Sequence, residues 1–406
     1  MIERYLNPEI NSIWDDQNKF DTWKLVQEKY VETLEELDVA ENGIAKKINQ
    51  SVVQKDEVYK QEEITNHDLA SFVDILQKKV GEGSNWIHYG LTSSDIVDTA
   101  NSVLIMQSLD YVKDLVNDFL STLQEKAVQE KDTLIIGRTH GVYAEETFLG
   151  NIFGNWHLEV ARGLNRLENS KNNISFGKLS GPVGNHSVVT SEMEKLTLEK
   201  LNLKPEQFAN QIVSRDRYAE VVSSLGILAS TYERIATNIR SYQRSEISEM
   251  YESFKDGQKG SSAMPHKKNP IGSERITGLA RIMRSYVSTS LENMVLWNER
   301  DISNSSVERI MLPDAFHLIS FMSIELNSIL KHLVINYEQI NINLEDAKNK
   351  SVSQKYLSYL VNNGVDRDTA YRKIQEEIFN NLSAEELKKE LEKEFKLEFP
   401  DLENQV

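Results

Sequence analysis

Polar side chains that can move protons or hold anions gather in seven short segments of a sequence that otherwise has helical patterns. Histidine exchanges protons near neutral pH, and arginine and the free N–H groups at a helix start bind anions. His67, His88, His140 and His266 all lie in these segments. The segments are ITNHDLASF (64–72), WIHYGLTSSDIVDT (86–99), IIGRTHGVYAEE (135–146), KLSGPVGNHS (178–187), NQIVSRDR (210–217), GSSAMPHKKNP (260–270) and WNERDISNSSVERIMLPD (297–314).

Each segment taken alone also has a purely structural interpretation. A histidine at a helix end can be a cap, TSSD before IVDT can be an ordinary helix start, and SGPVG can be a turn. The arginines near residue 300 can form a salt-bridged helix face. Their occurrence together favours a functional site. In contrast, His157, His317 and His332 lie within long helical patterns and are predicted to be structural.

Composition, net charge and missing motifs argue against several classes of site and protein. The absence of cysteine excludes disulfides, cysteine zinc sites and thiol nucleophiles. H-E-x-x-H, G-x-G-x-x-G, the phosphate-loop pattern and G-x-S-x-G are all missing, and no metal site is predicted. The net charge of −17 argues against a nucleic-acid binder, so an anionic substrate needs a local basic pocket. Neither a leader-like start nor a membrane-spanning run is present, which favours a cytoplasmic location.

Long helices must position these segments. Apolar residues alternate in steps of three and four along two stretches, which predicts helices with one apolar seam. The stretches are Ile105, Leu109, Val112, Val116, Phe119, Leu123 and Tyr218, Val221, Leu225, Leu228, Tyr232, Ile235, Ile239, Tyr242. Similar patterns follow Glu145–Glu146 through Phe148 to Leu164, run from about 273 to 296, and run from 313 to about 334. Five such helices predict an all-α protein built around an elongated bundle.

The ends of the chain have shorter helical patterns. We expect an N-terminal helical domain (1–92), a central long-helix bundle (93–340) and a small C-terminal helical domain (341–406). In the last of these, LSAEELKKELEKEF begins with a helix-capping serine, Ser383, followed by strong helix formers.

The polar segments carry a family resemblance. GSSAMPHKKNP is similar to the signature loop of the fumarase/aspartase superfamily, G-S-S-x-M-P-x-K-x-N. MIERY…PEI, HYGLTSSD, GRTHGV, the RD near 215 and ERDIS…SS…ERI resemble the bacterial adenylosuccinate lyase family, in order from Ile2 to about residue 375. The resemblance implies a three-domain subunit with a central five-helix bundle. It also implies a homotetramer with a twenty-helix core, active sites shared between three subunits, and no cofactor.

The implied reaction is the β-elimination of fumarate in purine nucleotide biosynthesis. Its two nucleotide substrates are adenylosuccinate, which gives AMP, and the succinyl-aminoimidazole carboxamide ribotide (SAICAR), which gives the carboxamide ribotide (AICAR). Such an elimination needs a base for a weakly acidic C–H, a sink for carbanion charge and an acid for the leaving nitrogen.

The resemblance implies that the catalytic base lies in the signature loop. Ser261 matches that base, with Ser262 as the open alternative, and loop N–H groups and Lys267 would favour its oxyanion. Lys267 and Asn269 would also stabilise the substrate carboxylate on which negative charge builds up. Gly257 and Gly260 would let the loop close over the substrate, although the loop could also be a mere connector.

The remaining matched residues bind the substrate or protonate it. His140 matches the acid for the purine nitrogen, and Glu274 matches the carboxylate that orients it. His67, with its neighbour Asp68, and His88 would flank the substrate. Other expected contacts to the succinyl group, the phosphate or the base are Arg4, Tyr5, Thr92, Ser93, Gln211, Arg300, Ser305 and Arg309.

Three positions depart from the family pattern: Tyr143 replaces a histidine, Glu146 a proline and Asn151 a lysine, and the tail is short. These departures put fine substrate contacts and the docking of the third domain in question. Two alternatives stay open. One is another superfamily enzyme, namely argininosuccinate lyase, fumarase, aspartase or carboxymuconate cycloisomerase. The other is a non-catalytic helical oligomer, against which the intact set of catalytic residues argues.

Overall fold

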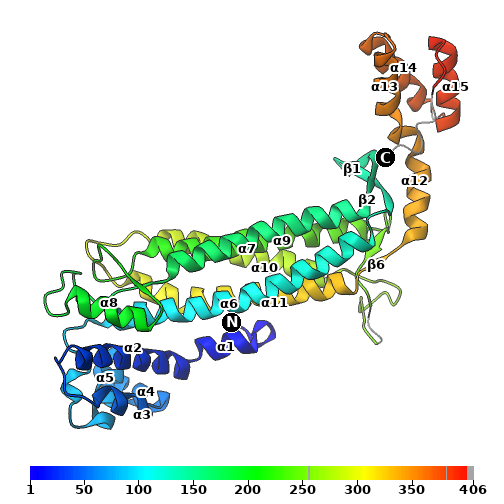
Figure 1. Cartoon of the computed structure of the whole chain (residues 1–406). Coiled ribbons are helices and arrows are strands. Elements are labelled where there is room, and N and C mark those ends of the chain that lie inside the picture. Colours follow the sequence, from blue (N-terminus) through cyan, green and yellow to red (C-terminus); the bar gives the residue numbers. More distant parts are fainter. Residues whose placement is uncertain (255–256, 381, 400–406) are drawn as a thin grey trace. The chain divides into compact units, whose positions relative to one another are not determined.

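The computed structural model describes residues 1–254, 257–380 and 382–399, and most of them are helical (Figure 1). Contacts divide the chain into two compact units. The first comprises residues 1–119, 160–234 and 275–326, and the second comprises 120–159, 235–274 and the chain from 327 onward. The predicted all-α class is confirmed, whereas the division into three domains stays a prediction.

Five long helices form the predicted bundle and lie side by side in Figure 1. They are α6 (Ser93–Gln129), α7 (Leu149–Ile174), α9 (Arg215–Tyr242), α10 (Ile271–Glu292) and α11 (Ser303–Lys331). The predicted seam of α6 from Ile105 to Leu123 is fully buried. In the first unit, the Phe119 and Tyr232 rings meet edge-on at 5.4 Å between centroids, and the Tyr232 hydroxyl lies 3.1 Å from Ser323 Oγ.

Short helices complete the first unit. They are η1 (Glu3–Tyr5), α1 (Pro8–Trp14), α2 (Asp16–Glu36), α3 (Ile44–Gln50), α4 (Lys55–Thr65), α5 (Asp68–Val80), η2 (Ser84–Trp86) and α8 (Ser191–Lys200). Buried aromatic rings of Phe20, Trp23 and Phe72 join α2 to α5. The short strand β3 (Phe176–Gly177) pairs in parallel with β4 (Lys204–Pro205).

The second unit contains a hairpin and the C-terminal helices. The hairpin consists of β1 (Leu134–Thr139) and β2 (Val142–Phe148), and α12 (Tyr337–Ser351) packs against it. A second antiparallel pair joins β5 (Met250–Tyr251) to β6 (Val334–Ile335). The C-terminal helices are α13 (Ser353–Asn362), α14 (Arg367–Phe379) and α15 (Ala384–Phe395). As predicted, Ser383 caps α15, through a capping box with Glu386.

Two predicted helix starts are wrong. Phe148 belongs to β2, and α7 begins only at Leu149. Helix α11 begins at Ser303, so that Pro313 lies inside it and not at its first turn. The turns of α11 before Pro313 carry polar residues that line a cavity, and they therefore lack the apolar period that identifies a helix. Among the described helices, none is long and apolar enough to cross a membrane.

Candidate active site

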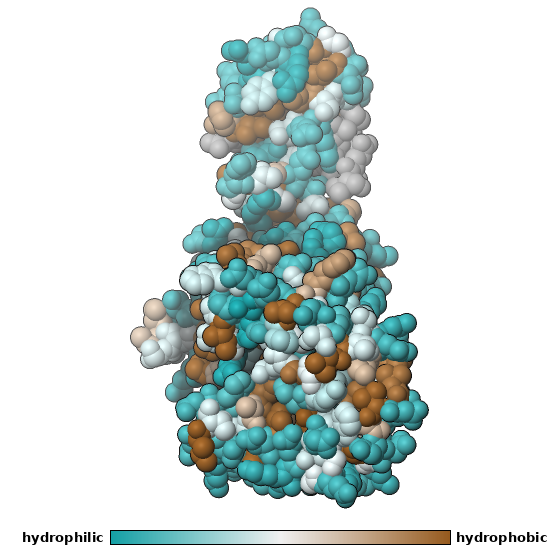
Figure 2. Space-filling view, turned by 90° about the vertical axis from the view of Figure 1, so that its left-hand side faces the viewer, coloured by the Kyte–Doolittle hydropathy of each residue, from teal (hydrophilic) through white to brown (hydrophobic). Residues whose placement is uncertain are grey.

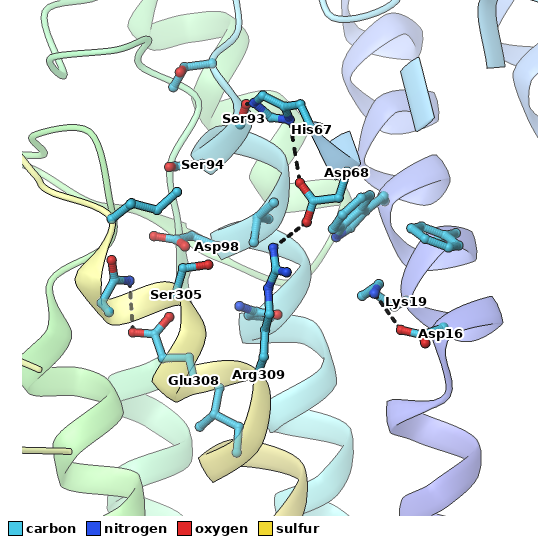
Figure 3. A pocket seen from close by; sticks show the side chains of 18 of the residues that line it. Asp16, Lys19, His67, Asp68, Ser93, Ser94, Asp98, Ser305, Glu308 and Arg309 are labelled. Atoms are coloured by element: carbon cyan, nitrogen blue, oxygen red, sulfur yellow. Dashed lines mark hydrogen bonds and ion pairs between the residues drawn. The ribbon is translucent and has the colours of Figure 1, made fainter. Parts of the chain in front are cut away.

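A polar cavity of about 620 Å³ lies in the first unit (Figure 3). The turn between α4 and α5, the start of α6, the loop before α9 and the first turns of α11 contribute its walls. Eight of the predicted site residues line it: His67, Asp68, Thr92, Ser93, Gln211, Arg300, Ser305 and Arg309. Segments far apart in the sequence are thus brought together here.

Two helix starts point into this cavity. His67 is the N-cap of α5, and its Nδ1 accepts a hydrogen bond from the Ala70 N–H at 3.4 Å. The neutral ring then carries its proton on Nε2, which lies 3.5 Å from Ser93 Oγ. At the start of α6, Asp95 accepts the Thr92 N–H at 2.8 Å. The positive ends of the two helix dipoles favour an anionic ligand at this end of the cavity.

Arg300 is the cation that remains available to a ligand. Its Nη1 donates to Gln211 Oε1 and to Ser94 Oγ, both at 3.2 Å, and no carboxylate of the described residues lies within ion-pair distance of it. Arg309, by contrast, is already paired with Asp68 at 2.6 Å. We therefore regard Arg300 as the main charged donor for a substrate anion.

A buried ion cluster lies near Arg300. The guanidinium of Arg215 contacts Asp98 at 2.5 Å and Glu308 at 2.8 Å, and all three side chains are buried. Over the whole lining, the cations Lys19, Arg215, Arg300 and Arg309 face the carboxylates Asp16, Glu62, Asp68, Asp98 and Glu308. The cavity is therefore not the basic pocket that the sequence led us to expect, because its positive character is local to Arg300 and the helix starts.

His88 does not line the cavity, and a buried glutamine holds it. The Oε1 atom of Gln27 accepts the His88 backbone N–H at 3.0 Å, while Nε2 of Gln27 lies 3.0 Å from His88 Nδ1. Because the backbone N–H can only donate, the amide must present its NH₂ group to Nδ1, which then carries no proton. Burial lowers the pKa of His88 to about 4, so the neutral ring carries its proton on Nε2. Gln27 was missed in the sequence because no motif marks it.

Arg4 and Tyr5 also belong to the first unit but do not line the cavity. They form the short helix η1, where the Tyr5 ring meets Phe321 edge-on at 5.0 Å. The Met1 ammonium lies 2.7 Å from Asp314 of α11.

In the second unit, His140 is at the tip of the β1–β2 hairpin. Thr139 pairs with Val142, and the two residues between them have positive φ angles, 54° at His140 and 80° at Gly141. This is the pattern of a type I′ turn, whose twist matches that of the strands. The turn leaves the imidazole exposed.

The hairpin is fixed close to its tip, at Arg138, the residue before Thr139 in β1. Arg138 forms two hydrogen bonds of 2.8 and 2.7 Å with the buried carboxylate of Glu249. The ring of Tyr143, one of the departures from the family pattern, contacts Arg138 and also Lys350 of α12. Burial, together with a hydrogen bond to Asp346 of α12, raises the pKa of Tyr143. The substituted residue thus serves the contact between the hairpin and α12.

The signature loop of the second unit presents Ser261 to backbone donors. Its Oγ accepts hydrogen bonds from Ala263 N–H at 3.3 Å and Met264 N–H at 3.1 Å. The side chain of Asn269 donates to the Gly260 carbonyl at 2.8 Å and closes the loop. Donors that point at a hydroxyl oxygen favour its deprotonated form, as the proposed base requires.

A second cavity, of about 980 Å³, lies beside this loop. Lys267, Asn269 and Glu274 line it, as do Arg240 and Arg244 of the region around the end of α9, which the sequence did not single out. The α10 start beneath it is capped by Glu252, which accepts the Ser273 N–H at 2.6 Å. Ser261, Ser262 and His140 belong to the same unit but do not line this cavity. In the described part of the chain, no cluster of acidic and histidine side chains is arranged to hold a metal ion.

The chain is similar to known lyases over most of its length. A family model described as lyase matches residues 19–283. The adenylosuccinate lyase of Thermotoga maritima is 41% identical over 386 residues, which cover 95% of this chain and 90% of the relative. That of Aquifex aeolicus is 42% identical, over 92% of this chain and 87% of the relative.

Solved structures show the same fold at low sequence identity. A fumarate lyase from Mesorhizobium sp. BNC1 has a TM-score of 0.86 at 19% identity, over 97% of this chain and 92% of that one. The 3-carboxy-cis,cis-muconate lactonizing enzyme of Pseudomonas putida has a TM-score of 0.85 at 20% identity, over 96% and 91%. Fold and family model together define a lyase of the fumarase/aspartase superfamily. Within it, the chain belongs to the adenylosuccinate lyase family.

Proposed function

We propose that this chain is a carbon–nitrogen lyase that releases fumarate from adenylosuccinate, forming AMP, and from SAICAR, forming AICAR. The observation that carries the proposal is the gathering of eight family-matched residues in one cavity around Arg300, a cation with no carboxylate partner among the described residues. A dianionic succinyl group or a phosphate supplies the missing negative charge.

The elimination begins at the signature loop. The Ser261 oxyanion removes a proton from the succinyl carbon next to the one that carries nitrogen. The electron pair that is left moves into the adjacent carboxylate, where Lys267 and Asn269 stabilise it as the aci-carboxylate. The two N–H donors at Ser261 Oγ support this assignment over Ser262, for whose hydroxyl the described residues provide no such donors.

The C–N bond then breaks. The electrons of the aci-carboxylate form the carbon–carbon double bond of fumarate, and the bonding pair leaves with the nitrogen. His140 donates a proton to that nitrogen, with Glu274 as its orienting carboxylate. The exposed position of His140 at a hairpin tip supports a role toward a ligand outside its own unit's core.

We further propose a homotetramer in which separate copies contribute the two cavities and the hairpin to one active site. Exposed apolar side chains on the long helices support association, among them Ile227 of α9, Ile282 and Leu291 of α10, and Ile310 and Ile324 of α11. Apolar residues also reach the face shown in Figure 2. The cytoplasmic location and the absence of a cofactor stay predictions.

The test is to incubate the purified protein with adenylosuccinate and follow the ultraviolet spectrum. We expect conversion to AMP with an equal amount of fumarate, and no conversion by Ser261→Ala. Argininosuccinate, malate, aspartate and carboxymuconate serve as competing substrates. Turnover of one of these in place of adenylosuccinate, or of none of the compounds, would overturn the proposal in favour of another superfamily enzyme or a non-catalytic oligomer.

A further inference from the structure

A fully buried lysine lies in the segment KLSGPVGNHS, which has no assigned role so far. The side chain of Lys178 has no exposed surface and forms an ion pair with Asp95, whose side chain is also fully buried. Its Nζ also donates to the Gly181 carbonyl at 2.8 Å. A lysine is almost never fully buried unless it is paired, so this position is costly to maintain.

Asp95 joins the start of α6 to the turn that follows Lys178. One carboxylate oxygen accepts the Thr92 N–H at 2.8 Å and the Gly181 N–H at 3.2 Å. The other contacts Lys178 and accepts the Ser180 N–H at 3.3 Å. The carboxylate therefore ties together two segments that are more than eighty residues apart in the sequence.

This link continues along the cavity wall. The carbonyl of Pro182, next to the tied turn, accepts a hydrogen bond from Gln211 Nε2 at 3.4 Å. Gln211 Oε1 in turn accepts from Arg300 at 3.2 Å, and Arg300 donates to Ser94 Oγ at 3.2 Å. Ser94 precedes Asp95 in the chain, so these hydrogen bonds close into a ring around Arg300. We call this ring of contacts the circuit.

We propose that Lys178 is a positioning residue that holds this circuit and thereby sets Thr92, Ser93, Gln211 and Arg300 for one anionic group of the substrate. The inference rests on the proposed function, because it assigns these residues to substrate binding. Lys178 itself does not line the cavity, so we assign it no contact with the substrate. Its ammonium acts by keeping the turn at 180–182 against the start of α6.

The experiment compares the KM for adenylosuccinate of the full-length wild type with that of Lys178→Met. A purely structural role lowers the amount of folded enzyme, and hence the apparent kcat, but leaves KM unchanged. We expect KM to rise by about ten- to a hundredfold, as for the loss of one or two hydrogen bonds to a charged group. Leu76→Ala is the matched control, because Leu76 is fully buried in the first unit yet lies outside the cavity lining. It should lower the melting temperature and keep the wild-type KM.

A double variant, Asp95→Asn with Lys178→Met, guards against misfolding from an unpaired buried charge. It removes both charges, but methionine cannot donate to the Gly181 carbonyl, so KM should again rise at least tenfold. A wild-type KM in either folded variant would overturn the proposal, as would an equal rise of KM in Leu76→Ala. Wild-type turnover of adenylosuccinate is measured first, and its absence would count against the function and not against the role of Lys178.

Discussion

Replacing Gln27 by glutamate tests how the chain controls the protonation of His88. In the wild type, the amide NH₂ faces Nδ1 of His88, and burial holds the pKa of His88 at about 4. At pH values well above 4, the ring of His88 is therefore neutral and offers an N–H donor at Nε2. A carboxylate at position 27 still accepts the backbone N–H, but it demands a proton on Nδ1.

The electrostatic change is large. At the 3.0 Å separation of the two side chains, an attraction between opposite charges of about 5 kcal/mol is expected for an effective dielectric constant of about 20. Burial of the new carboxylate opposes part of it, so the pKa of His88 should rise from about 4 toward neutrality. Above the new pKa the neutral ring holds its proton on Nδ1, and Nε2 becomes an acceptor. Below that pKa both nitrogens carry a proton, so Nε2 is a donor again.

The assay is kcat/KM for adenylosuccinate between pH 5.5 and 8.5, expressed as the ratio of Gln27→Glu to wild type so that shared ionisations cancel. The family resemblance predicts that His88 flanks the substrate, so that its Nε2 would donate to a charged group of the substrate. On that prediction the ratio should fall at high pH by about ten- to a hundredfold, the cost of one hydrogen bond to a charged ligand group. As pH falls, the ratio should recover. Gln27→Met, which has no carboxylate, should lose activity without recovery. A ratio independent of pH, or one that falls on acidification, would refute the reasoning.

Three further predictions concern the proposed site. Ser261→Ala and His140→Ala should each lower kcat by about 10²- to 10⁴-fold without changing the oligomer measured by light scattering, and mixing the two should restore some turnover if sites are shared between subunits. No recovery despite proven subunit exchange would contradict shared sites. Arg300→Met should raise KM about ten- to a hundredfold, and Arg300→Lys should recover only part of it, since lysine lacks the planar fork; equal KM values would remove the assigned role. In Gly260→Ala, the added Cβ would lie 2.1 Å from the Lys267 carbonyl oxygen, so the loop must shift and kcat should fall about 10²-fold; an unchanged steady-state rate would contradict this.

The long helices could be predicted because their signal is local. A seam with steps of three and four, as from Ile105 to Phe119, requires only that one side of a helix be buried, and these residues are indeed fully buried. The helix cap at Ser383 depends only on its near neighbour Glu386, so it could be predicted from the sequence as well as the long helices could. The clustering of polar segments was visible for the same reason, since several of them mark helix starts.

Pairings between distant residues could not be predicted. A lysine buried against Asp95 looks in the sequence like any surface lysine, and nothing near Gln27 shows that it faces His88. The hairpin was missed because its turn has His140 at a position where asparagine, aspartate or glycine is the usual signal. These features depend on which segments meet in space, and periodicity carries no information on that.

The turn at the hairpin tip has a consequence for evolution. With φ at 54°, residue 140 has a left-handed backbone, a conformation that favours glycine, asparagine, aspartate and histidine. Of these four amino acids, only histidine has a side chain that gains and loses a proton near neutrality. The backbone preference and the proton chemistry, acting independently, therefore both favour histidine at that position.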